Sequence, residues 1–330
     1  MTFRILFVCL ALCASTASAV ADQSFTFFMT ADTHYGLDLF YLNEPYNKTT
    51  IDAMNKLPGT AYPAALGGVV ETPNGVLVAG DLTDTPASLN FFGSHTIPTF
   101  KRDGFNDDYK VDGTGRLKYP VYEGYGNHDV DNAEHSYTLD GIRQRNLVRP
   151  GVTEVASDGL AYSWDWEGVH FINLNIYPGA TERTGDSLAF LISDLQNEVG
   201  NSGRPVILMQ HFGFDGFSLD WWTDAERQAY ADALAPYNIL GIFHGHLHTT
   251  LEYQWNGYDV FDGSAAKDGN FLVVRINNGK MDVASREDNR WGFTFSKTYT
   301  IPEPSTIVMG LMGMGIVIVW RSVGRKRGKN

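Results

Sequence analysis

Residues 239–248 read ILGIFHGHLH, an apolar run of strand length that leads into three closely spaced histidines. Apolar runs of this length with β-branched residues indicate buried strands. Polar side chains directly after such a strand lie at the carboxyl edge of the sheet, where α/β proteins bind their ligands. The stretch therefore predicts a strand over 239–243 and a functional loop over 244–248.

Four other stretches of the chain have the same organisation. The apolar runs 25–29, 76–78, 120–122 and 205–209 lead, respectively, into Asp32 and His34, into Asp81 and Asp84, into Asn127, His128 and Asp129, and into His211. Each motif is weak by itself, because a single histidine on an apolar strand is more often a core residue than a ligand. Together they place five of the nine histidines beside carboxylate and amide groups. We therefore expect all five loops to meet at one sheet edge.

The remaining elements are predicted from caps and turns. Asp186 is a candidate cap of one helix, and Thr223 with Glu226 forms a candidate capping box for another. Residues 258–300 are strand-rich, with a hairpin turn at 277–279. We expect one α/β domain in which two mixed sheets pack together with helices outside.

The side chains gathered in the five loops suit a metal centre. Neutral imidazole combined with carboxylate and amide oxygens favours Zn, Fe or Mn over a copper–thiolate site or a calcium cage. Two such ions about 3.5–4 Å apart, joined by one carboxylate, can stabilise both sides of a phosphoryl displacement.

The order Asp-x-His, Gly-Asp-x-x-Asp, Gly-Asn-His-Asp, His, Gly-His-x-His, which spans residues 32–248, resembles that of the calcineurin-like metallophosphoesterases. The resemblance implies their four-layer α-β-β-α sandwich. It also implies a set of roles: Asp32, His34 and His248 for the first metal, Asn127, His211 and His246 for the second, Asp81 as the bridge, and His128 near the leaving group, oriented by Asp84.

One position departs from a branch of that family. Purple acid phosphatases place a tyrosine ligand three residues after the bridging aspartate, where this chain has Asp84. The departure argues against an Fe(III)–tyrosinate site and leaves two divalent ions of Mn, Zn or Fe(II).

The expected reaction is hydrolysis of a small phosphate ester by in-line attack of a hydroxide shared by the two metals. A phosphomonoesterase is the first choice, and a phosphodiesterase on small or cyclic nucleotides is the second. A displayed surface or matrix protein with an inactive site is the non-enzymatic alternative. That alternative predicts eroded ligands, whereas every ligand type is present.

Several other polar and aromatic residues have less specific interpretations. Asp129 either orients His128 or fixes its loop, with the structural role favoured; His244 is expected to face away from the metals. Three histidines, His95, His135 and His170, are expected to be ordinary polar residues. Trp221 and Trp222 either cover the cleft or pack in the core, and Lys101 with Arg102 is expected to be a solvated pair. The insertions 36–66, 85–118 and 212–224 are expected to shape the pocket.

Composition excludes several classes of protein. The chain has 330 residues, 43% of them hydrophobic and 19% charged, so it can bury a large core and is not disordered. Between the two chain ends, 19 Lys and Arg oppose 37 Asp and Glu, a net charge of −18. Such a body repels polyanions, so duplex nucleic acid is not an expected partner.

Residues 1–21 have the features of a signal peptide. Arg4 precedes an apolar run, and small residues at 17–19 and 19–21 fit signal-peptidase cleavage. Both cysteines, Cys9 and Cys13, lie inside this segment. The mature chain is therefore expected to be exported and to contain no disulfide or thiolate ligand.

Residues 301–330 have the features of a sorting signal, which leaves residues 22–300 as the catalytic body. Pro302-Glu303-Pro304 is followed by an apolar stretch, 307–320, and a basic end. This order resembles the PEP-CTERM signal, which implies an exosortase-type processing enzyme as a partner. A plain membrane anchor is the alternative. Either way, we expect the body in the periplasm, on the outer surface or in the extracellular matrix, with transient or lasting membrane attachment through 307–320.

Overall fold

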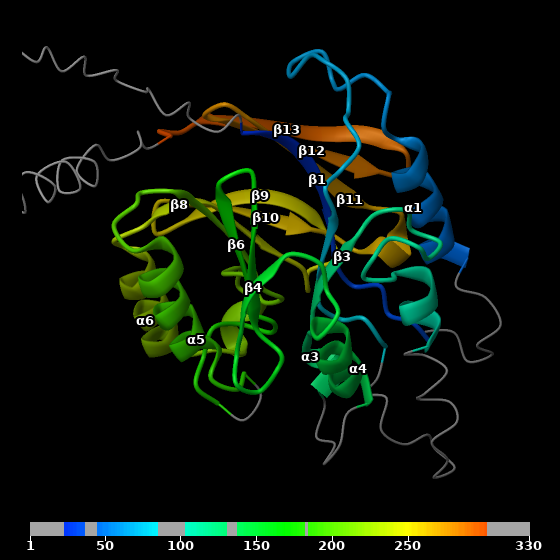
Figure 1. Cartoon of the computed structure of the whole chain (residues 1–330). Coiled ribbons are helices and arrows are strands. Elements are labelled where there is room, and N and C mark those ends of the chain that lie inside the picture. The colour runs from blue at the N-terminus through cyan, green and yellow to red at the C-terminus, as the bar shows by residue number, and fades with distance from the viewer. Residues whose placement is uncertain (1–22, 37–44, 85–102, 131–136, 182–183, 302–330) are drawn as a thin grey trace, which may run out of the picture. The chain divides into compact units, whose positions relative to one another are not determined.

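Two mixed β-sheets packed face to face form the centre of the computed structural model (Figure 1). It describes residues 23–36, 45–84, 103–130, 137–181 and 184–301.

The first sheet has six strands in the order β13-β12-β11-β1-β2-β3. Their bounds are β1 Ser24–Thr30, β2 Val76–Ala79, β3 Val121–Gly124, β11 Phe271–Asn277, β12 Lys280–Glu287 and β13 Arg290–Thr298. Strands β1, β2 and β3 run parallel to one another, whereas β11, β12 and β13 form an antiparallel extension.

The second sheet has seven strands in the order β4-β5-β6-β7-β8-β10-β9. Their bounds are β4 Val152–Val155, β5 Tyr162–Trp166, β6 Val169–Asn173, β7 Pro205–Met209, β8 Asn238–His244, β9 Thr250–Trp255 and β10 Tyr258–Gly263. Its central strands β6, β7, β8 and β10 are parallel, and both edges are antiparallel.

Alternation along β1 shows how one strand serves two cores. The Phe27 ring lies between the sheets, 5.4 Å from the Phe171 ring of β6 and 5.7 Å from the Phe243 ring of β8. Its neighbour Phe28 belongs to the outer core, where it packs 5.7 Å from the ring of Phe271. Because successive side chains of a strand point to opposite faces, a strand covered on both sides is apolar throughout. The predicted continuous apolar runs are therefore confirmed as buried strands.

Helices cover the outer faces of the two sheets. Figure 1 shows α1 on one side of the sandwich and α5 with α6 on the other. The bounds are α1 Pro45–Lys56, α3 Asn127–Val130, α4 Tyr137–Asn146, α5 Ser187–Asp194, the π-helical turn η1 Leu195–Val199, α6 Asp224–Leu234, and the short 3-10 helices η2 Ser218–Asp220 and η3 Ala266–Asp268. Residues 103–108 are also helical. The expected four-layer α-β-β-α sandwich is confirmed.

The two predicted helix caps have different outcomes. The Thr223 hydroxyl accepts from the Glu226 amide while the Glu226 carboxylate accepts from the Thr223 amide, so the predicted capping box is present. Helix α5 begins directly after Asp186, but the Asp186 side chain makes no capping hydrogen bond. The predicted start of the helix is therefore right, but the predicted side-chain cap is wrong. The hydroxyl of Ser187, the first helical residue, donates to the Tyr177 carbonyl. The predicted turn before β12 is confirmed, with left-handed φ angles of 44° at Asn278 and 84° at Gly279.

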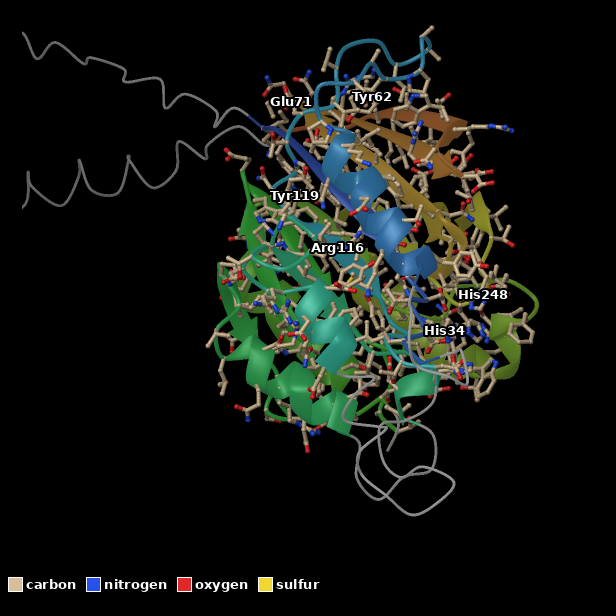
Figure 2. All side chains as sticks on the ribbon, turned by 90° about the vertical axis from the view of Figure 1, so that its right-hand side faces the viewer. His34, Tyr62, Glu71, Arg116, Tyr119 and His248 are labelled. Carbon is tan, nitrogen blue, oxygen red and sulfur yellow. The ribbon has the colours of Figure 1, made fainter. Side chains whose placement is uncertain are left out.

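Loops that follow the parallel strands gather at one end of the sandwich, as predicted. His34 comes after β1 and His248 comes after β8, yet their Nε2 atoms lie 3.1 Å apart. Figure 2 shows these two residues together beside one end of α1, with Tyr62 and Glu71 toward the other end. The Asn47 amide of α1 donates to the main-chain carbonyl of Thr33 over 2.5 Å, which fastens the helix to this edge.

Both predicted targeting segments, 1–21 and 301–330, lie almost wholly outside the described residues, as do His95, His135, Lys101 and Arg102. Among the residues that the structure describes, no helix is long and apolar enough to cross a membrane. The apolar stretch 307–320 is not among them.

Candidate metal centre

Five of the predicted ligands have a left-handed backbone. Their φ angles are 52° for Asp32, 44° for His34, 50° for Asp81, 78° for His246 and 56° for His248. Such angles are uncommon outside glycine and cost on the order of 1–3 kcal/mol each. Main-chain hydrogen bonds of 3.0 Å, from Asp32 to Gly80 and from His34 to Asp81, help to hold the first two. Strain of this kind concentrates at functional sites, although hairpin turns of this chain also contain such residues.

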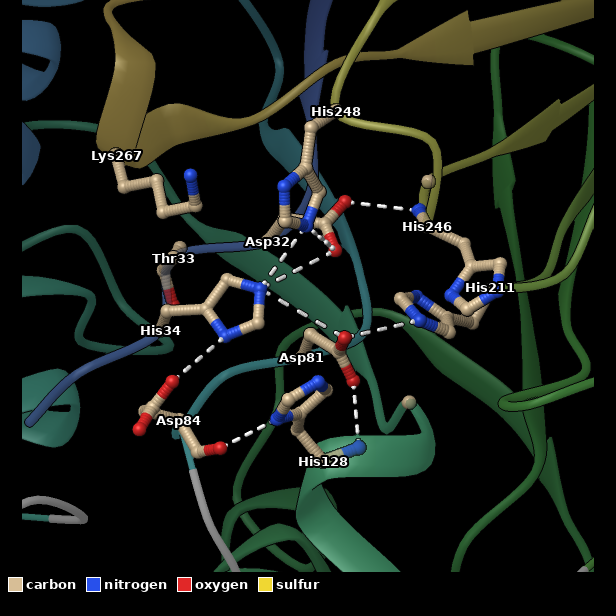
Figure 3. Close-up of polar contacts among 12 residues, drawn as sticks. Asp32, Thr33, His34, Asp81, Asp84, His128, His211, His246, His248 and Lys267 are labelled. Carbon is tan, nitrogen blue, oxygen red and sulfur yellow. Dashed lines mark hydrogen bonds and ion pairs between the residues drawn. The ribbon is translucent and has the colours of Figure 1, made fainter. Parts of the chain in front are cut away.

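The first cluster of donor atoms comes from the loops after β1 and β8. Asp32 Oδ1 lies 3.2 Å from His248 Nε2 and 3.6 Å from His34 Nε2 (Figure 3). These three residues form a group whose ligand atoms all lie within 4.8 Å of one another. The other oxygen of Asp32 accepts from the main-chain amide of His246 over 2.9 Å, which fixes the carboxylate. The three residues predicted for the first metal are therefore neighbours.

The second cluster combines the loops after β2, β3, β7 and β8. His211 Nε2 lies 3.2 Å from Asp81 Oδ2 and 3.1 Å from Asn127 Oδ1. His246 joins Asp81 and His211 in a second group of close ligand atoms. His211 Nδ1 lies 2.7 Å from the Ala79 carbonyl and donates to it, so Nε2 has the lone pair of the neutral ring. The His211 Nε2, Asp81 Oδ2 and Asn127 Oδ1 atoms are thus neighbouring electron-pair donors.

Asp81 lies between the two clusters. Its Oδ2 atom, 3.2 Å from His211 Nε2, is also 3.8 Å from His34 Nε2 (Figure 3). Its Oδ1 atom accepts from the main-chain amide of His128 over 2.9 Å. A carboxylate in this position can share its oxygens between two cations.

Unpartnered atoms test whether a cation fits these clusters. Among the described residues, Asp32 Oδ1 and His246 Nε2 are buried without a hydrogen-bond partner. Burial, followed by the charge of His211, lowers the pKa of His246 to about 3, so its ring is neutral and has a lone pair to offer. Buried polar atoms are rarely left unsatisfied. A divalent transition metal would satisfy both atoms, so the donor set fits metal ions.

Two other rings respond to the buried carboxylates. Burial lowers the pKa of His34, but contacts with Asp32 and Asp84 outweigh burial and raise it to about 10. Burial likewise opposes the rise at His211, where the charge of Asp81 prevails and brings the pKa to about 9. The buried carboxylates therefore favour a positive charge at this edge, where each of the two rings takes up a proton. A metal ion would take the place of that proton.

His128 is held differently from the prediction. Its Nδ1 atom makes a short hydrogen bond to the main-chain carbonyl of Asp84 (Figure 3). The Asp84 carboxylate instead faces His34, with Oδ1 3.6 Å from His34 Nδ1. The expectation that the Asp84 side chain orients His128 is therefore corrected: the Asp84 main chain does so. The His128 ring lies 4.8 Å from the His34 ring, and His128 forms a third group of close ligand atoms with His34 and Asp81.

Asp129 has the structural role that was favoured. It is fully buried and accepts from the main-chain amides of Leu82, Thr83 and Gly126 over 2.9–3.1 Å, and from the Thr83 hydroxyl over 2.9 Å. These bonds join the loop after β2 to the loop after β3. Burial, with the charge of Asp81, raises the pKa of Asp129 to about 6.

Two glycines let the ligand loops approach one another. A Cβ atom at Gly126 would lie 2.2 Å from Asp81 Oδ1 and 2.7 Å from His211 Nε2. A Cβ atom at Gly245 would lie 2.7 Å from Asp32 Oδ2. Only a residue without a side chain fits at either position, which explains the glycine of Gly-Asn-His-Asp and of Gly-His-x-His.

Two histidines outside the clusters are fully buried. His244 ends β8 and contacts the Tyr253 hydroxyl through Nε2 over 2.9 Å, away from the ligand groups, as predicted. His170 was expected to be an ordinary polar residue, and it lies outside the ligand groups. Its two ring nitrogens lie 2.7 Å from the partly exposed Asp165 and 2.6 Å from the buried Asp194, so its role is that of a paired polar residue in the sheet. Burial opposes the shift, but these carboxylates raise the pKa of His170.

Sequence reasoning missed one residue and left another undecided. Figure 3 shows Lys267 of η3 on the side of His34 and His248. Its ammonium lies 2.9 Å from the Asp268 carboxylate. No motif surrounds it, so nothing in the sequence indicates its position. The tryptophan pair divides: Trp222 is core, whereas Trp221 is 38% exposed with its ring 6.1 Å from the His246 ring.

Sequence comparison relates this chain to known proteins. Residues 300–327 match the PEP-CTERM protein-sorting motif, which suggests export and surface sorting. Purple acid phosphatase 23 of Arabidopsis thaliana is 26% identical over 193 residues, 53% of this chain and 41% of the plant protein. The chain thus spans less than half the length of this curated relative.

Solved structures show the same fold. A dimetal phosphatase from Danio rerio has a TM-score of 0.50 at 14% identity, covering 84% of this chain and all of the fish protein. GAP50, the anchor in the inner membrane complex of Plasmodium, has a TM-score of 0.53 at 9% identity, covering 88% and 94%. Residues 25–250, more than half of the chain, match the profile of the calcineurin-like phosphoesterases. The chain therefore belongs to that family.

Proposed function

We propose that this chain is an exported phosphomonoesterase with a dinuclear metal centre. The observation that carries the proposal is the convergence of two groups of lone pairs on either side of Asp81. Asp32, His34 and His248 would hold one divalent ion. Asn127, His211 and His246 would hold the other, and Asp81 would contact both. When bound, such a pair supplies Lewis acidity at the phosphoryl group and a water of lowered pKa.

The chain's own residues prepare this centre. The Ala79 carbonyl fixes the tautomer of His211, and the His246 amide fixes the Asp32 carboxylate. Three of the ligands, Asp32, Asp81 and His211, are almost completely buried, so water does not compete for them from behind. Because divalent ions reverse the local sign of charge, an acidic body still accepts a phosphate.

His128 is proposed as the general acid. The Asp84 carbonyl accepts from Nδ1–H, so in the doubly protonated ring Nε2–H is the group that would give its proton to the leaving oxygen and leave the ring neutral. His128 adjoins His34 and Asp81, so the proton would be delivered next to the centre.

The metals are proposed to be Mn, Zn or Fe(II). Asp84 stands three residues after Asp81, and its carboxylate lies 3.6 Å from His34 Nδ1. No phenolate is therefore offered from that position. Although the curated relative is named a purple acid phosphatase, we expect the purified protein to lack a visible tyrosinate absorption band.

Export is proposed to proceed through both chain ends. Signal peptidase would remove 1–19 or 1–21, and an exosortase-type enzyme would trim the tail near Pro302-Glu303-Pro304. The body, 22–300, would then act in the periplasm, on the outer surface or in the matrix. Intact-mass measurement on protein from an exosortase-bearing host tests this; an unprocessed tail there supports a plain anchor.

Metal analysis combined with a substrate panel tests the proposed activity. We expect close to two transition metals per chain, and faster hydrolysis of aryl phosphomonoesters than of the matching diesters with Mn, Zn or Fe. Asp81→Asn should lose both metals and more than roughly 100-fold in activity, because even the loss of a residue that only hydrogen-bonds a metal ligand costs about 10–100-fold. Asp232→Asn, which changes an exposed aspartate on α6 in the same way, is the control.

Each other outcome supports a different conclusion. A preference for diesters would favour the phosphodiesterase alternative. Two bound metals without turnover of either ester would favour a displayed protein with an inactive site. A chain that binds a single calcium ion, or no metal under varied supply, would end the dinuclear proposal.

A further inference from the structure

Exposed aromatic side chains adjoin the second ligand cluster. The Phe217 ring stacks on the His246 ring at 4.9 Å between centroids and 23° between planes, and Phe217 is 57% exposed. Trp221 is 38% exposed, and its ring stands perpendicular to that of His246. Behind both, the buried Phe212 ring lies 4.5 Å from His246 and 5.3 Å from Trp221. We name Phe217 and Trp221 the aromatic platform.

The position of the platform is unusual for this chain. Ten large hydrophobic side chains are exposed among the described residues, and three of them lie within residues 217–221. Scattered exposed hydrophobics need no explanation, but a group beside a polar site marks a binding surface. Aromatic rings next to a cluster of metal-type ligands can contact whatever is attached to the group bound there.

Local hydrogen bonds hold the platform in place. The Asp215 carboxylate accepts from the main-chain amides of Phe217 and Ser218, both over 2.9 Å, and from the Ser218 hydroxyl over 2.6 Å. These bonds define the turn from which Phe217 projects. The platform is therefore formed before any ligand arrives, which reduces the entropic cost of binding.

A hydrogen-bond relay connects the platform loop to the loop of His246. The Phe214 amide donates to the Tyr253 hydroxyl over 2.8 Å, and that hydroxyl donates to His244 Nε2 over 2.9 Å. His244 Nδ1 donates in turn to the Gly245 carbonyl over 2.8 Å. The relay uses both nitrogens of a histidine that lies outside the ligand groups. It fixes the position of the loop that carries the platform relative to the loop that carries His246.

We infer that the aromatic platform binds a planar ring of the substrate, so that the enzyme prefers phosphate esters that carry a nucleobase or a similar aromatic group. The inference rests on the proposed function and adds its substrate class. Stacking of a base on an aromatic side chain corresponds to a factor of about five to 150 in binding. The competing explanation is that Phe217 only shields His246 from solvent.

Adenosine 5′-monophosphate and ribose 5-phosphate separate these explanations. Both release the same kind of primary alkoxide, so their kcat/KM ratio isolates the contribution of the base. We expect wild type to prefer the nucleotide by about five- to 150-fold. Phe217→Ala and Trp221→Ala should bring the ratio toward one. Phe217→Tyr, which keeps an aromatic ring, should retain the wild-type ratio. Val155→Ala is the control, because it shortens an exposed apolar side chain on the far edge strand β4.

The outcomes keep the inference apart from the proposed function. If wild type hydrolyses both esters equally well, the platform has no role in specificity and the inference fails, while the phosphatase activity stands. If Phe217→Ala loses both substrates equally, together with metal, the ring is a shield. If neither ester is hydrolysed, the proposed activity is in question, and calorimetric titration decides the inference. Equal affinity of the two esters for the metal-loaded protein would overturn it.

Discussion

His128 is a single side chain whose role can be separated from that of the ligands. Its Nδ1 atom is committed to the Asp84 carbonyl, which leaves Nε2 for proton transfer. We expect His128→Ala to retain both metals and to lose about 10²–10⁴-fold on alkyl phosphates, with a smaller loss on activated aryl phosphates. The measurement is the slope of log kcat/KM against the leaving-group pKa.

His246→Ala is the comparison for that experiment. It should depress both classes of ester, because it weakens a metal site instead of a proton transfer. If His128→Ala has the same slope as wild type, and chemistry limits the rate, His128 is not the general acid.

The neighbouring aspartate gives a second prediction at this scale. Because the main chain of Asp84 holds His128, Asp84→Asn should leave the leaving-group slope as in wild type. The carboxylate faces His34 at 3.6 Å instead, so the substitution should weaken metal retention on that side, measured by dialysis against a chelator. A flattened or steepened slope would show that the carboxylate acts on His128 after all.

Between elements, the spacing of ligand loops depends on glycine. A Cβ atom at Gly126 would lie 2.2 Å from Asp81 Oδ1, whereas one at Gly216 would have nothing within 4 Å. We expect Gly126→Ala to lose metal and activity while far-ultraviolet circular dichroism still reports a folded sandwich. Gly216→Ala makes the same chemical change away from the ligands and should retain its metal. Full metal content in Gly126→Ala would mean that the loops are not closely packed around Asp81.

The strands, and the gathering of the candidate ligands at one edge, were predictable because the signal for each is local. A continuous apolar run indicates a strand covered on both faces, and the polar residues after it lie at the carboxyl edge of the sheet. The ionic network of His170 was not predictable, because Asp165 and Asp194 reach it from separate elements. The contact between Asp84 and His34 depends on a side-chain rotamer, and no spacing encodes that. The aromatic platform needed the fold before its nearness to His246 was visible.

For the whole molecule, a buried ionic cluster links acid stability to the fold. The fully buried Glu123 of β3 lies 2.6 Å from both Arg145 and Arg149. Burial raises the pKa of Glu123, but the two guanidinium groups outweigh burial and lower it from 4.5 to about 2. Since the unfolded chain binds this proton more readily, the stabilisation is complete above about pH 4.5 and is lost as pH falls through about 2.

The loss should amount to about 3 kcal/mol between pH 6 and pH 2. Glu123→Gln should be less stable than wild type at pH 6, and the gap should shrink by about this amount at pH 2. Urea unfolding of both proteins in chelator, which removes the contribution of metal, provides the measurement. A gap that does not change with pH would contradict a lowered pKa at Glu123.

Each of the two ligand clusters draws on both sheets. Asp32, His34, Asp81 and Asn127 follow strands of the six-stranded sheet, whereas His211, His246 and His248 follow strands of the seven-stranded one. Any ion held there is therefore a cross-link that closes one end of the sandwich. Outside the cell, small domains commonly obtain such cross-links from disulfides, but both cysteines of this chain lie within residues 1–21. Coordination bonds would take over that mechanical task, and a chelator would act on this protein as a reducing agent acts on a disulfide-bonded one.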